Sequence, residues 1–193
     1  MTTRLLLIRH GETELSGRFC GHLDPALNES GRRQSKELAA ALAEDMLDAV
    51  YCSDLQRAST LGETLAASRA LRCRSSAGLR EIYFGEWEGL RWSSIERRDP
   101  ELAVRWLAAF PYLAAPGAEE FNAFENRVLA EVKSICSRPE ARVAIVTHAG
   151  VIRVLLQNLV RLSMKQAWEQ PVPLCSALRL SRAGESRRWR LVQ

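Results

Sequence analysis

The chain has 193 residues, of which 47% are hydrophobic and 26% charged, and its formal net charge is +4. A chain of this length buries a core of its own, and this composition excludes a disordered tail, a collagen-like repeat and a disulfide scaffold. The five cysteines are widely spaced and include no C-x-x-C pair, so they predict neither a disulfide framework nor a structural metal site.

The sequence contains no segment with the length of a membrane span or the layout of a signal peptide. The first aliphatic run, residues 5–8, is followed at once by Arg9, whereas a membrane helix needs about 20 apolar residues. Most of the basic residues are arginines, but they form no stripe with interleaved aromatic residues of the kind that binds nucleic acids. We therefore expect a cytoplasmic protein that binds neither membranes nor nucleic acids.

Strands and helices are predicted to alternate along the chain. Apolar runs predict strands at 3–9, 48–52, 71–75 and 142–147, and helical patterns follow at 29–44, 55–68, 119–137 and 149–161. Asn28 is the expected N-cap of the first helix. Two short helices are expected within 92–110, divided at Asp99-Pro100 because proline disfavours helix in the residue before it. Residues 177–192 predict a hairpin that turns at 183–185.

This order of elements is typical of the α/β class. Alternating strands and helices predict a three-layer sandwich in which helices flank a mostly parallel sheet. No repeat, low-complexity tract or linker divides the sequence, so we expect a single domain over residues 1–193. Residues 79–89 predict a loop, and residues 92–117 predict a small helical cap.

Polar side chains follow three of the predicted strands. Arg9 and His10 lie at the end of the first strand. Arg57 lies one turn into the helix after the second strand, and His148 directly follows the strand at 142–147. Because ligands of open α/β sheets bind beyond the carboxyl ends of the strands, these side chains are expected to meet. Each has a plain structural explanation alone, but two histidines and two arginines together suit the binding of a phosphoryl group.

Four sequence blocks contain these residues. They read LIRHGET at 7–13, CSDLQRA at 52–58, LREIYFGEWEG at 79–89 and VTHAG at 146–150. In this order they resemble the signature of the histidine phosphatase superfamily, also called phosphoglycerate mutase-like, over most of the chain. The resemblance implies the family's fold and its phosphoryl-transfer chemistry, which requires neither a metal nor a cofactor.

The resemblance implies a role for each polar residue. His10 resembles the nucleophile that attacks phosphorus and forms a phosphohistidine, which water then hydrolyses. His10 must be neutral to attack, and the flanking cations Arg9 and Arg57 are expected to lower its pKa. Arg9, Arg57 and His148 resemble the clamp that binds the phosphate oxygens, and the backbone N–H of Ala149 is a further candidate donor.

Glu81 resembles the family's general acid. It would protonate the leaving oxygen of the ester and then accept a proton from the attacking water. Without the other blocks, Glu81 would be interpreted as an exposed loop carboxylate paired with Arg80. Glu86 and Glu88 are weaker candidates for the acid.

One position departs from the family pattern. Many members carry an asparagine six residues after the nucleophile that donates to the phosphate, and this chain has Ser16 there. A serine hydroxyl supplies one donor with a shorter reach. Ser16, Cys20 and Gly21 are therefore candidate substrate-binding residues beside the clamp.

Further segments point to a subgroup of the family. Residues 12–21, 23–27, 83–88 and 117–121 resemble α-ribazole-5′-phosphate phosphatases of cobalamin assembly. That resemblance implies α-ribazole 5′-phosphate as the small-molecule phosphomonoester partner. Candidates for contact with its leaving group are Arg18, Tyr83, Trp87, Trp92, Trp106 and other residues of the cap. The tryptophans could stack on its ring, although tryptophan more often packs in a core.

Several alternatives remain open from the sequence. The same chemistry would serve a broad-specificity phosphatase, or one for a sugar phosphate, a phosphoglycerate, a nucleotide or a phosphoprotein. A phosphoglycerate mutase would need a longer insertion after the acid-bearing loop, where only about thirty residues separate Gly89 from Asn122. A non-catalytic phospho-ligand binder would be expected to lack the acid or the nucleophile, and both are present. Monomer and homodimer are equally compatible with the sequence.

Overall fold

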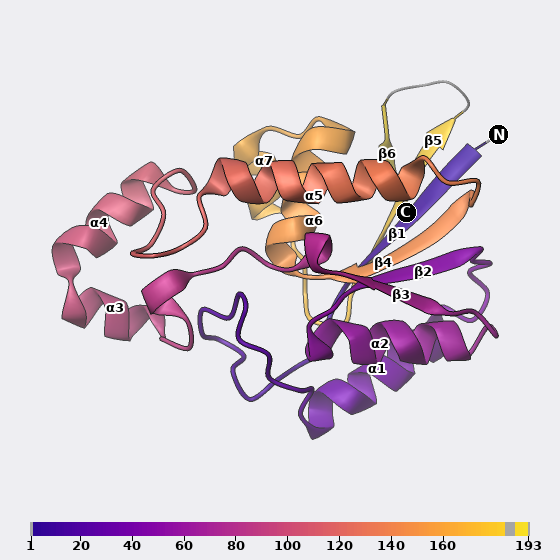
Figure 1. The fold of residues 1–193 in the computed structure, drawn as a ribbon, viewed down its shortest axis with the longest axis horizontal. Helices are drawn as coiled ribbons and strands as arrows, with labels where there is room; N and C mark the ends of the chain where they lie inside the picture. The colour runs from indigo at the N-terminus through magenta and orange to yellow at the C-terminus, as the bar shows by residue number, and fades with distance from the viewer. Residues whose placement is uncertain (1, 184–187, 193) are drawn as a thin grey trace.

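A mixed six-stranded sheet forms the centre of the computed structural model, which describes residues 2–183 and 188–192 (Figure 1). The strands follow the order β3-β2-β4-β1-β5-β6 across the sheet. Strands β3, β2, β4 and β1 run parallel, whereas β5 pairs antiparallel with both β1 and β6. The sheet is therefore mostly parallel, as the sequence predicts. The bounds are β1 Thr2–Arg9, β2 Ala49–Ser53, β3 Cys73–Ser76, β4 Arg142–Thr147, β5 Ala177–Ala183 and β6 Arg190–Val192.

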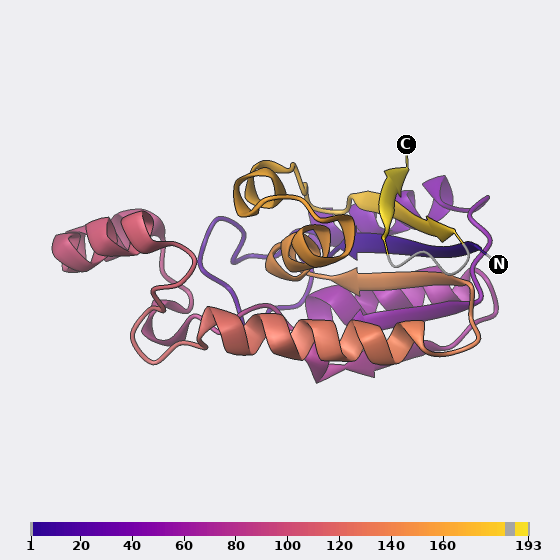
Figure 2. The same ribbon diagram turned by 90° about the horizontal axis from the view of Figure 1, so that it is seen from above.

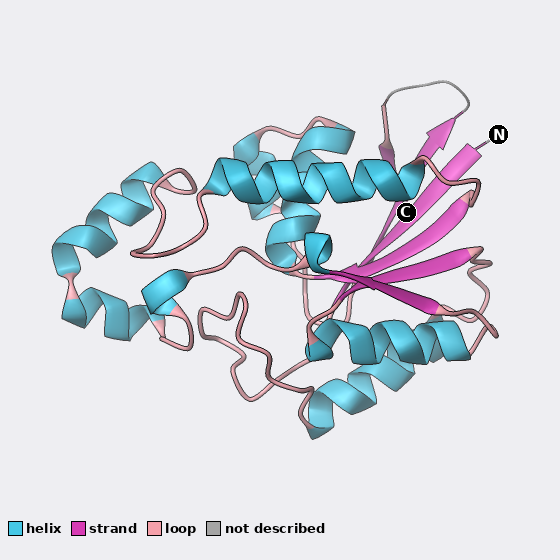
Figure 3. Cartoon of the chain, viewed as in Figure 1, coloured by secondary structure: helices cyan, strands magenta, loops and turns pink. Residues whose placement is uncertain are grey.

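Helices cover both faces of the sheet, which confirms the predicted three-layer α/β sandwich (Figure 3). Helices α1 (Glu29–Ala41) and α2 (Gln56–Ala67) pack on one face. Helices α5 (Phe121–Cys136) and α6 (Ala149–Leu155) pack on the other.

Strand β1 is apolar throughout because its alternate residues serve two different layers. Leu5 and Leu7 belong to the apolar cluster with α5 and α6, whereas Leu6 and Ile8 belong to the cluster with α1 and α2. A strand buried on both faces has a continuous hydrophobic run instead of an alternating one. Because β1 pairs parallel with β4, its last residues lie at the edge of the sheet where β4 also ends.

Several helix ends differ from the sequence prediction. The side chain of Asn28 accepts a hydrogen bond from the backbone N–H of Gly31, which confirms the predicted N-cap of α1. That helix ends at Ala41 instead of Glu44, because Leu42 leaves helical geometry and turns into the core. The helix predicted for 149–161 is α6 followed by a wider π-helical turn at Leu156–Val160.

Helix α7 (Met164–Glu169) is absent from the sequence prediction. The side chain of Ser163 accepts from the backbone N–H of Gln166, and the Gln166 side chain accepts from the backbone N–H of Ser163. This reciprocal pair is a capping box, a helix-start signal that the sequence contains and that the prediction missed.

The predicted loop at 79–89 contains two short 3₁₀ turns, Ala77–Leu79 at its start and Gly85–Trp87 near its end. The two expected short helices follow as α3 (Trp92–Arg98) and α4 (Pro100–Ala109).

Residues 92–117, here called the cap, project away from the sheet (Figure 2). The break between its helices lies at Asp99, whose side chain accepts from the backbone N–H of Leu102 and so starts α4. Ile95 and Ala103 of the cap are buried with Trp87 in a small apolar cluster of their own.

Strands β5 and β6 form the antiparallel pair predicted for 177–192. The predicted turn at 183–185 falls largely outside the described residues. Among the residues that the structure describes, no helix combines the length and the apolar character needed to cross a membrane.

Candidate active site

Three of the predicted polar residues meet at the carboxyl ends of β1 and β4. These strands are parallel neighbours with Arg9 opposite Thr147, which brings His10 next to His148. The ring centroids of the two histidines lie 5.1 Å apart in an edge-on arrangement. His148 is 1% exposed, and within the described part of the chain neither of its ring nitrogens has a hydrogen-bond partner.

Arg57 reaches the site from the first turn of α2. Its side chain is buried, and its Nη1 and Nη2 donate to the carbonyl oxygens of Leu23 and Gly21, each at 2.7 Å. Nη2 also donates to the carbonyl of Cys20 at 3.2 Å. Arg57 therefore holds the loop that precedes α1 against the site.

Unpaired buried donors gather around one cavity. The Nε atoms of Arg9 and Arg57 have no partner among the described residues, and neither do the ring nitrogens of His148. Since buried polar groups in folded proteins are almost always hydrogen-bonded, these donors call for an anionic ligand. The cavity has a volume of about 320 Å³, which accommodates a phosphoryl group with part of a leaving group. Its lining includes Arg9, His10, Ser16, Cys20, Arg57, Glu81 and Ala149. His148 is not part of this lining, but its ring packs edge-on against the ring of His10, which is.

One ring nitrogen of His10 makes a hydrogen bond, and the other makes none to the residues that the structure describes. Its Nδ1 lies 2.7 Å from the carbonyl oxygen of Gly11, an acceptor, so Nδ1 carries the proton and Nε2 keeps its lone pair. The pKa of His10 is lowered to about 3, first by burial and then by the positive charges of Arg57 and Arg9. The sequence attributes this shift to the arginines, but desolvation is the larger cause because it penalises the charged ring directly.

His148 is held neutral by the same effects. Burial lowers its pKa well below the ordinary value, and the charges of Arg57 and Arg9 act in the same direction. A neutral imidazole has one N–H to donate and one lone pair. His148 can therefore contribute a single hydrogen bond to an anion in the cavity.

Glu81 is buried beside the start of α6. Its Oε1 accepts from the backbone N–H of Ile82 at 3.1 Å, and its Oε2 accepts from the backbone N–H of Gly150 at 3.0 Å. A Cβ atom at position 150 would lie only 2.2 Å from Oε1, so glycine is required for this close approach. The alternative interpretation of Glu81 as a partner of Arg80 is wrong, because Arg80 makes two hydrogen bonds of 2.7 and 2.6 Å to Asp54.

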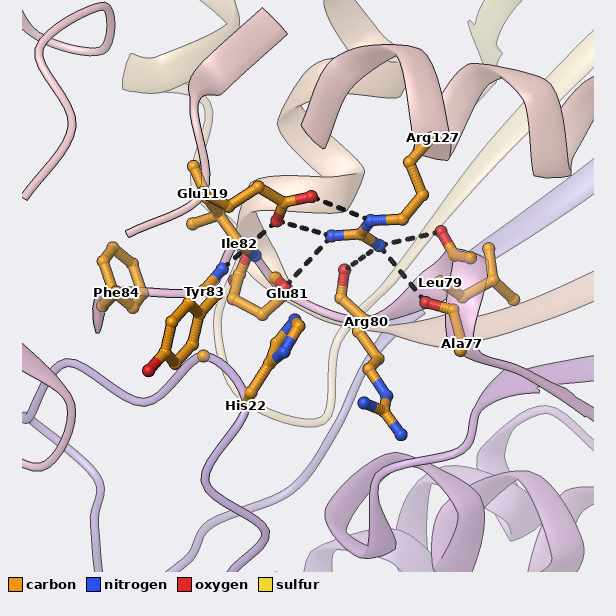
Figure 4. Close-up of polar contacts among 12 residues, drawn as sticks. His22, Ala77, Leu79, Arg80, Glu81, Ile82, Tyr83, Phe84, Glu119 and Arg127 are labelled. Atoms are coloured by element: carbon orange, nitrogen blue, oxygen red, sulfur yellow. Dashed lines mark hydrogen bonds and ion pairs between the residues drawn. The ribbon is translucent and has the colours of Figure 1, made fainter. Parts of the chain in front are cut away.

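Arg127 of α5 fixes the segment that carries Glu81 (Figure 4). Its guanidinium donates to backbone carbonyls just before the acid, among them those of Gly78 at 3.2 Å and Arg80 at 3.1 Å, and to the carbonyl of Glu81 itself at 3.4 Å. It also pairs with Glu119, whose Oε2 accepts from Arg127 at 2.8 Å and from the backbone N–H of Tyr83 at 3.3 Å. Arg127 is therefore a positioning residue for Glu81.

The three remaining candidates from the loop before α1 occupy different places. Ser16 and Cys20 line the cavity, and the Ser16 hydroxyl accepts from the backbone N–H of Thr13 at 3.1 Å. Gly21 lies outside the cavity lining, and its N–H donates to Glu88 at 3.0 Å. A Cβ at position 21 would lie 2.1 Å from the carbonyl oxygen of Ile82, so glycine at this position allows the loop before α1 to lie against the acid-bearing loop.

Sequence reasoning missed three residues that shape the site. Glu88, a weaker candidate for the acid, instead accepts from the backbone N–H groups of four residues, Gly21, His22, Leu23 and Phe84. Apart from its ion pair with Glu119, Arg127 contacts backbone carbonyls some 50 residues away in sequence, which no local pattern indicates. Arg153 lies one helical turn after Ala149 and so faces the same side of α6, a spacing that could have identified it.

Metal ligands are not grouped near the site. Within residues 2–183 and 188–192, the side chains of His, Cys, Asp and Glu form no cluster of three or more that could hold a metal ion. The positive charge in the cavity comes from arginine side chains, chiefly Arg9 and Arg57.

Known proteins resemble this chain in sequence and in fold. A family model described as histidine phosphatase superfamily (branch 1) matches residues 5–193. A bifunctional protein of Mycobacterium tuberculosis is 41% identical over 159 residues, which are 80% of this chain and 43% of that protein. The adenosylcobalamin/alpha-ribazole phosphatase of Salmonella typhimurium is 30% identical over 168 residues, which are 86% of this chain and 83% of that protein. The solved structure of a mycobacterial glucosyl-3-phosphoglycerate phosphatase has a TM-score of 0.85 and 28% identity, covering 99% of this chain and 97% of that one.

This chain thus spans less than half of the mycobacterial relative but most of the Salmonella relative. The Salmonella relative and the protein of the solved structure are both named as phosphatases. The matched region includes all four sequence blocks and every polar residue of the cavity. The chain belongs to branch 1 of the histidine phosphatase superfamily.

Proposed function

We propose that this chain is a phosphomonoesterase that acts through a phosphohistidine on His10. The observation that carries the proposal is the free Nε2 of His10 in a cavity with the unpaired donors of Arg9 and Arg57. Glu81 lines the same cavity. A nucleophile, a set of anion-binding donors and a carboxyl group are the parts that phosphoryl transfer to a side chain requires.

In the first half-reaction, the lone pair of His10 Nε2 forms a bond to phosphorus while the ester P–O bond breaks. Arg9, Arg57 and His148 stabilise the negative charge on the equatorial oxygens. The leaving alkoxide is a strong base, so Glu81 in its acid form transfers a proton to it. The products of this step are the free alcohol and phosphorylated His10.

In the second half-reaction, the carboxylate of Glu81 accepts a proton from water. The water oxygen forms a bond to phosphorus while the P–N bond to His10 breaks, and inorganic phosphate is released. The lone pair returns to Nε2 and the proton stays on Glu81, so both groups regain their starting states. The arginine charges take the place that magnesium has in kinases, and the scheme therefore needs no metal.

The proposed substrate is α-ribazole 5′-phosphate, an intermediate of cobalamin nucleotide-loop synthesis. It is supported by the resemblance to phosphatases of that substrate at residues 12–21, 23–27, 83–88 and 117–121, and by the 30% identity to the Salmonella typhimurium protein. A sugar phosphate is the second candidate, because the glucosyl-3-phosphoglycerate phosphatase shares the fold over nearly the whole chain.

Phosphate release by the purified protein tests both parts of the proposal. The panel contains α-ribazole 5′-phosphate, 3-phosphoglycerate, fructose 2,6-bisphosphate, a mononucleotide and p-nitrophenyl phosphate, all with a chelator present. We expect kcat/KM for α-ribazole 5′-phosphate to exceed the others by about a hundredfold. The His10→Ala variant should lose at least about a thousandfold in kcat while remaining folded.

Each failure has a separate meaning. Equal kcat/KM values across the panel would refute the substrate and leave the mechanism intact. Activity that survives His10→Ala would refute the nucleophile, and inhibition by the chelator would refute the metal-free scheme. Conversion of 3-phosphoglycerate to its 2-phospho isomer without phosphate release would indicate a mutase.

A further inference from the structure

A second cavity, of about 230 Å³, lies directly beside the phosphate cavity. The two cavities share four lining residues, Phe19, Glu81, Phe84 and Ala149. Glu81, the proposed proton donor, thus borders both. A substrate whose phosphoryl group lies near His10 can therefore extend its leaving group into this second cavity.

Aromatic rings from several parts of the fold line this cavity. They come from the loop before α1, the acid-bearing loop, the cap, α5 and α7, and are Phe19, Phe84, Trp106, Phe110, Phe121 and Trp168. Phe110 connects the cap to α7, with ring centroids 4.8 Å from Trp106 and 4.7 Å from Trp168, both edge-on. Walls of this kind favour a flat apolar ligand.

Two hydrogen-bond donors in these walls lack partners. Nε of Arg153 and Nε1 of Trp168 are buried and have no acceptor within the described residues. The Arg153 guanidinium lies over the ring of Trp168, 5.3 Å from its centroid, so the two donors are adjacent. Leaving such donors unpaired is unfavourable, and an acceptor on a ligand would satisfy them.

The two carboxylates that line this cavity already accept hydrogen bonds. The carboxylate of Glu81 accepts from the backbone N–H groups of Ile82 and Gly150. Both carboxylate oxygens of Glu119 accept hydrogen bonds from the guanidinium of Arg127 (Figure 4). The cavity therefore offers free donors but no free carboxylate.

We propose that the second cavity binds the leaving group of the substrate as a flat heteroaromatic ring with a hydrogen-bond acceptor, to which Arg153 donates. Arg153 and Trp168 are then specificity residues, which bind the leaving group without taking part in bond making. This inference rests on the proposed phosphatase function and narrows its substrate class. A benzimidazole riboside, with its unprotonated ring nitrogen, belongs to this class.

Other leaving groups match the cavity less well. The ammonium group of a phosphoserine needs a carboxylate partner, but Glu81 must exchange a proton with the leaving oxygen and Glu119 is paired with Arg127. A sugar carries many hydroxyl groups, each of which needs polar partners when it is buried, and aromatic walls supply few. A heteroaromatic ring with one acceptor matches both the walls and the two donors.

Two substrates that differ only at the acceptor atom of the ring test the contribution of that atom. Benzimidazole riboside 5′-phosphate and indole riboside 5′-phosphate have nearly the same shape, but a C–H replaces the acceptor nitrogen in the indole. The wild-type enzyme should prefer the benzimidazole compound by about tenfold or more in kcat/KM, the range expected for a hydrogen bond from a charged donor. In Arg153→Met that preference should fall to about one, mainly through the loss of the benzimidazole compound.

Controls separate this role from a structural one. Phenyl phosphate has no acceptor on its ring, so Arg153→Met should lower its kcat/KM by much less than that of the benzimidazole compound if the fold is intact. Arg105→Met removes an exposed arginine of the cap and should retain the wild-type preference. Arg153→Gln, which keeps a donor on a shorter side chain, provides a second variant if the methionine variant does not fold.

The outcomes are distinguishable from failure of the proposed function. A wild-type enzyme that does not distinguish the two ribosides, or an Arg153→Met variant that keeps the full preference, would overturn the inference. Either result could occur while His10→Ala still abolishes phosphate release, so the phosphatase mechanism would stand. If His10→Ala retains activity, the mechanism itself fails.

Discussion

Replacing Gly150 with alanine should displace the carboxylate of Glu81 while the residue itself remains a glutamate. The added Cβ would lie 2.2 Å from Oε1 of Glu81, and 3.0 and 3.3 Å from its Cδ and Oε2. The carboxylate must therefore move by about 1 Å to reach van der Waals contact. Because the glycine is in helix α6, the substitution itself favours the helix by up to about 1 kcal/mol.

The expected effect is on the chemical step more than on folding. A displacement of about 1 Å in a catalytic group can lower a rate by about a hundredfold. We expect Gly150→Ala to lower kcat for an alkyl phosphate by about that factor. For p-nitrophenyl phosphate, whose leaving group needs no proton, the loss should be less than about fivefold. The melting temperature should change little, since the helix propensity offsets part of the clash.

A double-mutant cycle gives the control. If Gly150→Ala acts through Glu81, then in a Glu81→Gln background it should add almost nothing, because the group that it displaces no longer transfers a proton. The assay is steady-state kcat on both substrates for the two single variants and the double variant, with circular dichroism as a fold check. Wild-type activity of a folded Gly150→Ala variant on the alkyl phosphate would refute the assignment of Glu81 as the acid.

Three further expectations follow from the site. Glu81→Gln should reduce kcat far more for alkyl phosphates than for p-nitrophenyl phosphate, and equal losses on both would argue against an acid role. Arg127→Met removes the donors to the acid-bearing segment. It should lower kcat by about tenfold, and the free energy of unfolding measured in urea by about 2 kcal/mol. An unchanged kcat would show that the segment keeps its position without Arg127. The pKa of His10 is about 3 in the folded protein because of burial and the charges of Arg57 and Arg9, against 6.5 for an unperturbed histidine. As pH falls from 6.5 towards 3, the unfolded chain binds a proton that the folded protein does not, so the free energy of unfolding should fall across this window and stay level above it. His10→Ala should make that decline shallower in urea denaturation at a series of pH values, and an identical slope would contradict the neutral buried histidine.

Local sequence patterns were sufficient for the central strands. Residues 142–147 are predicted and found as a strand with the same bounds, because a short unbroken apolar run rich in β-branched residues is typical of a strand buried on both faces. The break before Pro100 was also predictable, since proline restricts the residue before it. Helix α7 was missed although Ser163 and Gln166 form a capping box, because its short length leaves little apolar periodicity to detect.

The sequence by itself determined the α/β class, the positions of the strand ends and the residues that follow them. His10 and His148 could be predicted to meet because the carboxyl ends of parallel strands share one edge of a sheet. Only the tertiary structure decided the roles of Arg57 in holding the loop at 20–23, of Arg127 in holding the segment of Glu81, and of Arg153 beside Trp168. These contacts join residues that are far apart in the chain. In two of them a guanidinium donates to backbone carbonyls, and every residue type has a backbone carbonyl, so the pattern of side chains in the sequence cannot predict such a contact. The aromatic cavity beside the phosphate site likewise exists only because the cap, α5 and α7 fold over the same edge of the sheet.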